Sequence, residues 1–429
     1  MIRKIVTAIV CIATIGVNAQ DGTVSPYSYF GIGDLRSAST VENQMMGGMA
    51  VYADSIHLNL QNPASYGKLG LQAQDKVGLM VYAIGISHKQ LTLKSATAEE
   101  NNKVTNLDYL SLGFSLGKGL GVGFGIMPYS SVGYNLVSES ENTNNAEVIN
   151  AYFGTGGLNR VYLSAGYEFA KDFSFGITAN FNFGTLDNER TQTVENVQFG
   201  TLDNRTSRIN GMDFNYALSY TPTIKGKNKL YTSLRVNTQA NLTSRNTQQI
   251  GSFSTATGQN IEVLDVDLLS RGLEDTEVKI PTKTTLGLGY GEDMKWFIGA
   301  EYSFQAKGTY ATEFIQIDNL TYQDASSFAF GGYFVPEHTS FNSYLKRITY
   351  RAGLRVDKTG MIVDNTEINN FGITFGVGLP LGKSFSNLNI GFELGKRGTT
   401  KNNLIEENYF KINLGLSLND LWFQKRKIN

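Results

Sequence analysis

Segments of about ten residues, in which apolar side chains alternate with polar or very small ones, constrain the fold of this chain most strongly. The segment from Phe173 to Phe183 places Phe, Ile or Ala at every odd position and Ser, Gly, Thr or Asn at every even position. Successive side chains of a β-strand point to opposite faces, so such a strand has one apolar and one polar face. About ten residues is also the length that a tilted strand needs to cross a membrane. The pattern therefore predicts membrane-spanning strands.

Similar segments recur along the chain, for example at 161–169, 296–304 and 373–379. They number about fourteen, and barrels that span membranes usually contain an even number of strands. A soluble sandwich or propeller would also alternate. Long strands and aromatic residues near the strand ends favour a membrane protein with interfacial aromatic girdles. The predicted fold class is all-β, with a transmembrane antiparallel β-barrel over residues 77–429.

The overall composition fits this class and excludes others. The formal net charge of −1 provides no basic surface of the kind that binds nucleic acid. The mean hydropathy of −0.19 resembles that of a soluble protein. A barrel gives the same average, because one face of each strand and the loops are polar.

The N-terminus has the three parts of a secretory signal peptide. Arg3 and Lys4 are followed by the apolar run 5–17, and small residues precede a predicted cleavage site before Gln20. A transmembrane anchor is the alternative, but this run is too short to cross a bilayer as a helix. We therefore predict export, with loss of residues 1–19, to the outer membrane of a Gram-negative-type envelope. The only cysteine, Cys11, lies in this leader, so the mature chain has no disulfide or reactive thiolate.

The last predicted strand and the connections carry further signals. Alternation continues from Phe410 to the aromatic pair ending at Phe423, which suits recognition by barrel-insertion machinery. Tight turns such as 170–172 alternate with long polar connections, predicted as loops, at 137–159, 241–275 and 306–327. Short periplasmic turns and longer outside loops are typical of such barrels.

Residues 20–76 lack the ten-residue alternation and contain glycine pairs and an Asn-Pro step, which indicate turns. A compact segment ahead of a barrel predicts a plug, or hatch, in the lumen. A flexible periplasmic leader is the alternative. Asp54 has two interpretations: an ion pair from hatch to wall with Arg351 or Arg355, which share a face, or the cap of a turn, which we prefer. The candidate hatch residues are Gly48, Ala50, Asp54, Asn62, Pro63 and Ala64.

Glycines repeat with a spacing of two at Gly121, Gly123 and Gly125, which places all three on one face of a strand. This arrangement leaves room for a plug or ligand, or lets the sheet bend, and bending is the simpler interpretation. A second repeat, Phe183–Asn188 and Phe199–Asn204, is interpreted as a local duplication of a strand and turn.

No residue pattern indicates catalysis. His88 follows Ser87 directly, so in a strand their side chains face opposite ways and cannot form a catalytic pair. His57 and His338 are interpreted as isolated histidines. The spacing of His, Asp and Glu does not match a metal site, and no cofactor is predicted. We predict that the protein is not an enzyme.

Several short motifs, taken in order, resemble the FadL/TodX family of outer-membrane transporters for hydrophobic compounds. Gly48-Met49-Ala50, Asp54 and Asn62-Pro63-Ala64 resemble that family's hatch. The barrel motifs that match are Ile280-Pro281 with 285–290, Tyr350–Arg355 and Gly376–Pro380.

The resemblance implies a fourteen-stranded barrel with an N-terminal hatch. It also implies passive uptake of hydrophobic molecules, such as long-chain fatty acids, through the plugged barrel and out of a lateral opening. Outer-membrane lipid and a hydrophobic ligand would be its partners. The long connections carry few apolar residues, unlike a capture groove for such ligands. Some members of the family do not transport, and they serve instead as structural or secretion partners, for example in the type IX system. Both functions stay open at this point.

Overall fold

The computed structural model describes residues 22–70, 79–143, 145–308, 314, 317, 319–382 and 385–421. The predicted signal peptide with Cys11, and the aromatic end of the last strand at 422–423, lie outside the described residues. Within the described part of the chain, no helix has the length and apolar character needed to cross a membrane.

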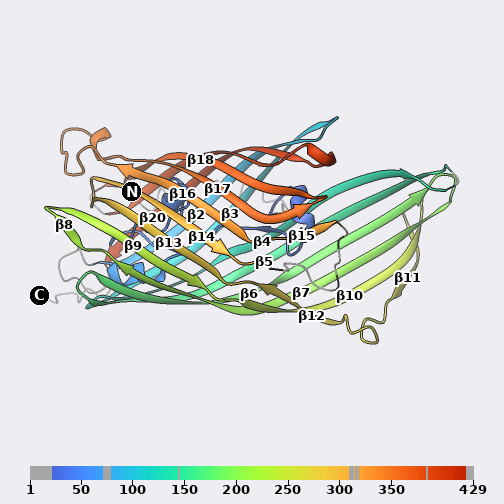
Figure 1. Cartoon of the computed structure of the whole chain (residues 1–429), viewed down its shortest axis with the longest axis horizontal. Helices are drawn as coiled ribbons and strands as arrows, with labels where there is room; N and C mark the ends of the chain where they lie inside the picture. The colour runs from blue at the N-terminus through green and yellow to red at the C-terminus, as the bar shows by residue number, and fades with distance from the viewer. Residues whose placement is uncertain are drawn as a thin grey trace, which may run out of the picture.

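The strands form one antiparallel sheet that closes into a barrel, as predicted (Figure 1). Closure occurs because β2 (Leu79–Lys94) pairs on one side with β3 and on the other with the last strand, β20 (Glu406–Leu421). Fourteen strands surround the barrel, two of which are each interrupted once. Those two are β9 with β10, and β12 with β13. Apart from β2 and β20, the wall is formed by β3 (Glu99–Gly117), β4 (Leu120–Glu141), β5 (Glu147–Ala170), β6 (Phe173–Val194), β7 (Phe199–Tyr220), β9 (Asn228–Asn237), β10 (Ala240–Ser254), β12 (Asp275–Ile280), β13 (Lys283–Glu292), β14 (Trp296–Gln305), β16 (Ala325–Phe334), β17 (Thr349–Val363), β18 (Thr366–Pro380) and β19 (Asn387–Gly398).

Short elements complete the fold. Among the described residues, four short strands each pair with a single neighbour, and five short helical segments lie in the N-terminal segment or the connections. The strands are β1 (Asp34–Leu35), β8 (Thr223–Lys225), β11 (Asn260–Asp265) and β15 (Leu320–Tyr322), and the helical segments are η1 (Pro26–Tyr29), α2 (Val41–Gln44), η2 (Pro63–Lys68), η3 (Leu345–Arg347) and η4 (Lys401–Asn403).

Alternation along each strand separates an apolar outside from a polar inside. In β6, Ser174 and Asn182 are fully buried on the inner face, whereas Phe175 and Phe181 are each 44% exposed on the outer face. Apolar side chains that face outward on a barrel are solvated by lipid. The alternation in the sequence thus indicates which side chains face the lipid and which face the lumen.

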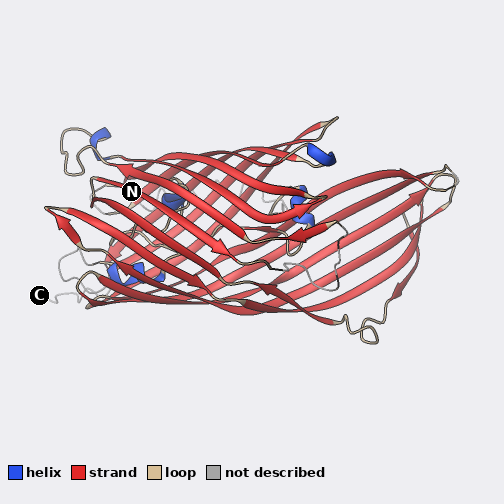
Figure 2. Ribbon diagram, in the orientation of Figure 1, coloured by secondary structure: helices blue, strands red, loops and turns tan. Residues whose placement is uncertain are grey.

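The two ends of the barrel differ (Figures 1 and 2). Short turns, such as the one between β5 and β6, lie at one end, which we call the turn end. At the other, the extended end, β4 to β7 and β10 project well beyond the remaining strands: β5 has 24 residues, whereas β14 has 10. The expectation of loops at 137–159 and 241–275 is therefore wrong, because most of these residues are in strands. A strand that leaves the membrane needs no lipid-facing apolar side, so its sequence loses the alternation.

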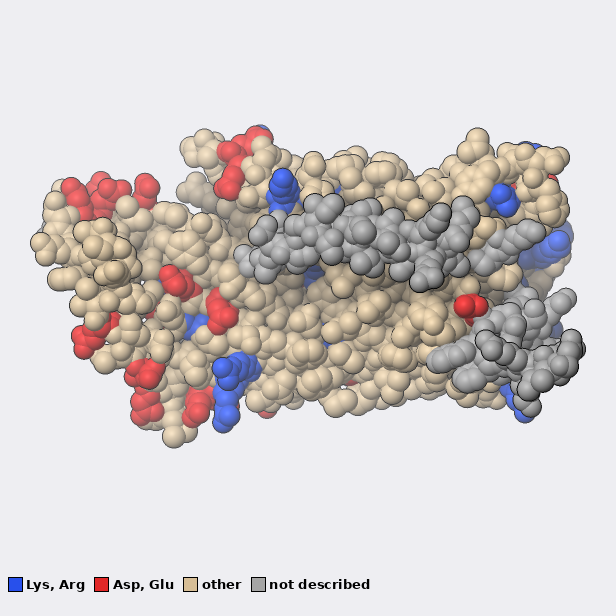
Figure 3. All heavy atoms as spheres, turned by 180° about the vertical axis from the view of Figure 1, so that it is seen from behind, with Lys and Arg blue, Asp and Glu red and all other residues tan. Residues whose placement is uncertain are grey.

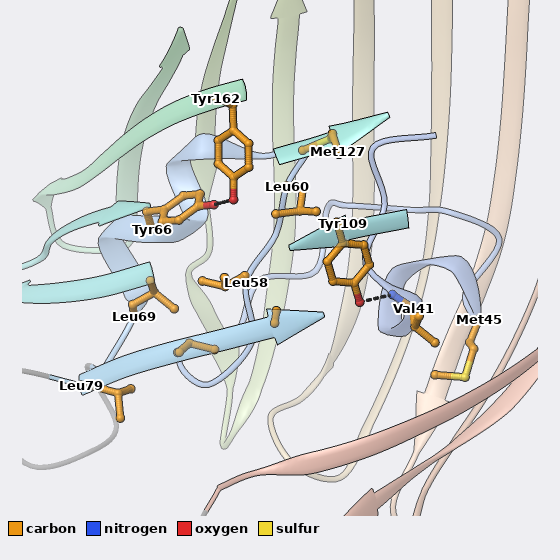
Figure 4. Packing of buried hydrophobic residues seen from close by; sticks show 12 residues of the cluster. Val41, Met45, Leu58, Leu60, Tyr66, Leu69, Leu79, Tyr109, Met127 and Tyr162 are labelled. Carbon is orange, nitrogen blue, oxygen red and sulfur yellow. Dashed lines mark hydrogen bonds between the residues drawn. The ribbon is translucent and has the colours of Figure 1, made fainter. Parts of the chain in front are cut away.

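Residues 22–70, the N-terminal segment, pack against inward-facing side chains of the wall (Figures 2 and 4). The Tyr66 hydroxyl lies 3.3 Å from the Tyr162 hydroxyl of β5, and the Val41 amide donates to the Tyr109 hydroxyl of β3 at 3.1 Å. Figure 4 shows Leu58 and Leu60 of the segment between these two contacts. The segment thus has a compact apolar core shared with the wall.

Candidate functional site

The motif residues of the N-terminal segment converge on one carbonyl. The Ala50 oxygen accepts hydrogen bonds from Asn59 Nδ2 at 2.8 Å and Asn62 Nδ2 at 3.3 Å. Asn62 Oδ1 accepts from the Ala64 amide at 3.2 Å and so caps η2, with Pro63 at its first position. Gly48 lies nearby in sequence with φ +83°, where a side chain would be strained. These contacts fold the two halves of the motif onto each other.

Glycines of the wall make room for this segment. A Cβ at Gly166 of β5 would overlap the Pro63 carbonyl oxygen, and one at Gly176 of β6 would overlap the Pro63 carbonyl carbon and the Ala64 amide. Gly121 and Gly123 of β4 stand in the same relation to the backbone and ring of Tyr66. At Gly121 and Gly123 the spacing of two therefore leaves room for the N-terminal segment. This contact replaces the simpler interpretation, in which these glycines let the sheet bend.

A buried ion pair on the wall holds the middle of the segment. Arg235 of β9 and Glu301 of β14 are 5% and 6% exposed, and their Nη2 and Oε2 atoms are 2.5 Å apart. Glu301 Oε1 accepts from the Ala50 amide at 2.9 Å, and Arg235 Nη1 donates to Gln61 Oε1 at 2.7 Å. We call these four residues the central lock. It joins the motif residue Ala50 to two strands of the wall.

Further polar contacts bind the segment to the last strands of the barrel. Asp34 pairs with Arg397 of β19 at 2.7 Å, and Glu42 accepts from Asn389 of β19 at 2.7 Å. Ser25 also donates to a carboxylate of β20, that of Glu407. None of these residues belongs to a motif that marks it in the sequence. The charged positions on the inner face of otherwise alternating strands are the signal that could have found the wall partners.

The structure places Asp54 in a local turn. Its Oδ1 accepts from the amides of Ile56 at 3.0 Å and His57 at 2.7 Å, and its Oδ2 lies 2.6 Å from His57 Nδ1. Asp54 thus caps a turn, which was the preferred interpretation.

The pairing of Asp54 with Arg351 or Arg355 must be corrected. Arg351 donates to Asn389 at 2.9 Å, and Arg355 pairs with Glu393 at 2.7 Å. Both arginines lie on one face of β17, as their spacing indicated, and each binds a residue of β19. The Asp54 carboxylate is instead bound by His57, three residues later, and by local backbone amides.

The Asp54–His57 pair leads to a prediction for pH dependence. Burial disfavours both charges, but the carboxylate outweighs burial and raises the pKa of His57, and the imidazole and two amides lower the pKa of Asp54. The contribution of charged His57 to folding stability is fully present below the ordinary histidine pKa of 6.5. It is lost as pH rises through the raised pKa of His57. The contribution of the Asp54 carboxylate to folding stability is present above the ordinary aspartate pKa of 3.8. It is lost as pH falls through the lowered pKa of Asp54.

We therefore expect the loss of thermal stability caused by His57→Gln to be largest between pH 3.8 and pH 6.5 and smaller at pH 9. Thermal unfolding of the full chain in detergent micelles at a series of pH values measures this difference. His88→Gln is the control, since His88 of β2 makes an exposed hydrogen bond with Thr105 of β3. A deficit independent of pH would contradict the ionised pair.

The lumen contains a cavity of about 560 Å³ between the N-terminal segment and the wall. Its lining contains many charged side chains beside apolar ones such as Phe30, Leu60 and Met127, and every carboxylate in it is part of an ion pair. The pairs are Asp34 with Arg397, Asp108 with Arg36 and Lys411, Asp213 with Arg160, Glu301 with Arg235, and Asp357 and Glu393 with Arg355.

The wall is interrupted between β3 and β4. Their pairing begins at the turn end and stops at Leu110 with Ile126, although both strands continue well beyond these residues. At this height β4 contains a bulge between Pro128 and Ser130, and the residues from Ser130 to Tyr134 are all buried, so the strand bends inward. The short strand β1 of the N-terminal segment pairs with β4 here, matching Leu35 with Ser130.

Groups of three or more His, Cys, Asp or Glu side chains that could hold a metal ion are absent from the described residues. The repeated segments Phe183–Asn188 and Phe199–Asn204 lie on neighbouring strands, β6 and β7, at the extended end. These observations add no chemistry to the site.

Comparison with solved structures shows which proteins share this fold. The toluene transporter TbuX of Ralstonia pickettii superposes with a TM-score of 0.57 at 14% identity, covering 89% of this chain and 98% of its own. The monoaromatic hydrocarbon channel CymD gives 0.55 at 11% identity, with 92% and 100% covered. A FadL homologue of Pseudomonas aeruginosa gives 0.51 at 12% identity, with 90% and 98% covered. The fold is therefore that of a FadL-like barrel, as the motifs indicated.

The sequence itself gives a family. No curated protein matches the chain. The sequence model of the BamG family matches residues 1–429, which is its whole length. The chain belongs to the BamG family.

Proposed function

We propose that this protein is an outer-membrane barrel that works as an interaction partner of other envelope proteins and does not transport hydrophobic molecules. In this proposal export removes residues 1–19, and the hatch at 20–76 keeps the lumen closed. The charged cavity is the observation that carries the proposal. The family name BamG hints at a barrel-assembly interaction, which supports a partner role.

The chemistry of the lumen disfavours a hydrophobic cargo. A ligand such as a fatty-acid chain gains free energy by leaving water for apolar surroundings. In this lumen its neighbours would include ion pairs such as Glu301 with Arg235 and Asp213 with Arg160. Displacing the water around charged groups is costly unless they find new partners, and an apolar ligand offers none. A tight apolar pocket is also missing beside Pro63 and Ala64 among the described residues, because these two pack directly on Gly166 and Gly176.

Passive passage of hydrophobic compounds is the second candidate. Two observations favour it: the barrel shares its fold with channels for such compounds, and the wall is unpaired between β3 and β4. In this case the ligand would leave sideways past β1, and the segment that carries β1 would have to move. Fatty acids and monoaromatic compounds would both be candidate cargo.

A cross-link that fixes β1 to the wall separates the two functions. Leu35 and Ser130 are directly paired, and paired residues of antiparallel strands have Cα atoms about 4.5–5.5 Å apart, within reach of a disulfide. We expect Leu35→Cys/Ser130→Cys, once oxidised, to restore a strain depleted of the protein as well as the native chain does. The proposed role needs no hatch movement, so the cross-link should not impair it. We also expect that neither the native chain nor this variant accelerates uptake of toluene or oleate into liposomes.

The matched control is Leu112→Cys/Phe124→Cys, which joins β3 to β4 where they are already paired. Restoration is measured as the abundance of other barrel proteins in the outer membrane. Uptake that stops on oxidation of the first variant and returns with reductant, while the control is unaffected, would establish the channel and contradict our proposal.

A further inference from the structure

The free edge of β4 continues beyond the contact with the N-terminal segment. Arg36 donates its amide to the Tyr129 carbonyl at 2.9 Å, and the Gly133 amide donates to Ser28 Oγ at 3.1 Å. Beyond Gly133, β4 runs to Glu141 and is paired with β5 along that whole length. On its other side, none of the described residues forms a hydrogen bond with the backbone of β4 past Gly133.

The backbone groups on this edge can be identified. In an antiparallel strand the N–H and C=O of one residue point to the same side, and the side alternates along the chain. Tyr129 and Gly133 use their edge groups toward the N-terminal segment, and the register from Ser130 onward is regular. The residues that direct N–H and C=O to the open edge are therefore Asn135, Val137, Glu139 and Glu141.

This edge already accepts a strand. β1 pairs with it in antiparallel fashion, with Asp34 opposite Ser131. An open row of donors and acceptors next to an occupied part of the same edge is a template for a further strand. The β2–β3 hairpin diverges from β4 at the extended end and does not cover it (Figure 1).

The charge around the edge selects the kind of strand. Glu139 and Glu141 are exposed on β4 at this edge. Acidic side chains gather at this end of the molecule (Figure 3). A second copy of the edge would bring glutamates of both copies together, which like charges on paired strands disfavour. A segment that alternates basic and small or β-branched residues would be complementary.

We propose that the β4 edge from Asn135 to Glu141 binds an extended, basic segment of a partner protein by adding it to the sheet as an antiparallel strand. This inference rests on the proposed partner function, for which it supplies a surface and a class of partner. Backbone hydrogen bonds would provide the affinity, and the glutamates would provide the preference for Lys and Arg.

The test uses the full chain in detergent micelles and a fluorescent peptide that alternates Lys with Val and Thr. We expect saturable binding by fluorescence anisotropy, and slower amide exchange at Asn135, Val137, Glu139 and Glu141 when the peptide is bound. Glu139→Lys/Glu141→Lys should weaken binding at least about tenfold, since it reverses the charge beside the added strand. The control Glu262→Lys/Glu277→Lys makes the same change of net charge at exposed positions on β11 and β12, away from this edge.

A peptide of the same sequence that is N-methylated at alternate residues keeps its charge but cannot donate hydrogen bonds to the edge. Equal binding of the methylated peptide, or equal weakening by both pairs of substitutions, would show general charge attraction and overturn the proposal, as would the absence of binding. The cross-linking experiment is independent of this one. If the oxidised Leu35→Cys/Ser130→Cys protein restores the depleted strain and the peptide does not bind, the partner function stands and only the edge is refuted.

Discussion

Replacing Glu301 by Ala should release the N-terminal segment from the wall. The substitution leaves Arg235 buried without its carboxylate and removes the acceptor of the Ala50 amide. Breaking one side of a buried ion pair typically costs about 3–5 kcal/mol. Since about 1.4 kcal/mol corresponds to a factor of ten, amide exchange of residues 45–62 should accelerate roughly a hundred- to several-thousandfold. Hydrogen–deuterium exchange with mass spectrometry, on the folded protein in micelles, measures this change.

Two further variants define what the result means. Asp275→Ala breaks the pair with Arg245, whose side chains are 60% and 67% exposed, and an exposed pair contributes at most about 1 kcal/mol. The double variant Arg235→Met/Glu301→Leu replaces the pair with apolar side chains and should recover part of the protection, because no charge stays buried. An acceleration below about tenfold for Glu301→Ala would mean that the central lock does not hold the segment.

The substitution Gly176→Val should displace the hatch from the other side of the lumen. Its Cβ would overlap the backbone of Pro63 and Ala64, and backbone in a tightly packed segment cannot move aside as a flexible side chain can. Overpacking of this kind typically costs about 1–3 kcal/mol. Lys68 lies at the end of η2, so trypsin should cut the variant there while the native chain resists cleavage. Gel electrophoresis of timed digests measures the difference.

The control for this variant is Ala179→Val on the same strand. Ala179 faces outward, so its larger side chain meets lipid or detergent and leaves η2 untouched. We expect this protein to be cut no faster than the native chain. Equal cleavage of Gly176→Val and Ala179→Val would mean that β6 gives way and the hatch stays in place.

The sequence predicted the barrel well because lipid imposes a simple rule on the wall. Phe175 and Phe181 alternate with buried Ser174 and Asn182, so the period of two is visible without any structure. The rule ends where the membrane ends. Segment 137–159 is strand for most of its length, yet water surrounds much of it and no apolar face is required. The amino-acid composition of such a strand is similar to that of a polar loop.

The contacts of the site were harder to predict, for a different physical reason. Glu301 interrupts an alternating apolar strand on its inner face, which marks it as a lumen residue. Its partners, however, depend on the register of β9 and β14 and on the path of a segment without periodicity. Asp54 illustrates the same difficulty. Two arginines on one strand face suggested a distant partner, whereas His57, three residues along the chain, is the one that binds it.

The attachment of the N-terminal segment to the last strands has a consequence for the order of assembly. Asp34 and Arg397 are separated by 363 positions, and Glu42 and Asn389 by 347. The carboxylates in the first part of the exported chain therefore find these partners only when almost the last part has arrived. Contacts between such distant residues form slowly. The seam between β2 and β20 can enclose the segment only after these partners arrive. An incomplete chain would leave both acidic groups unpaired, so premature closure is penalised by the same residues that stabilise the finished barrel.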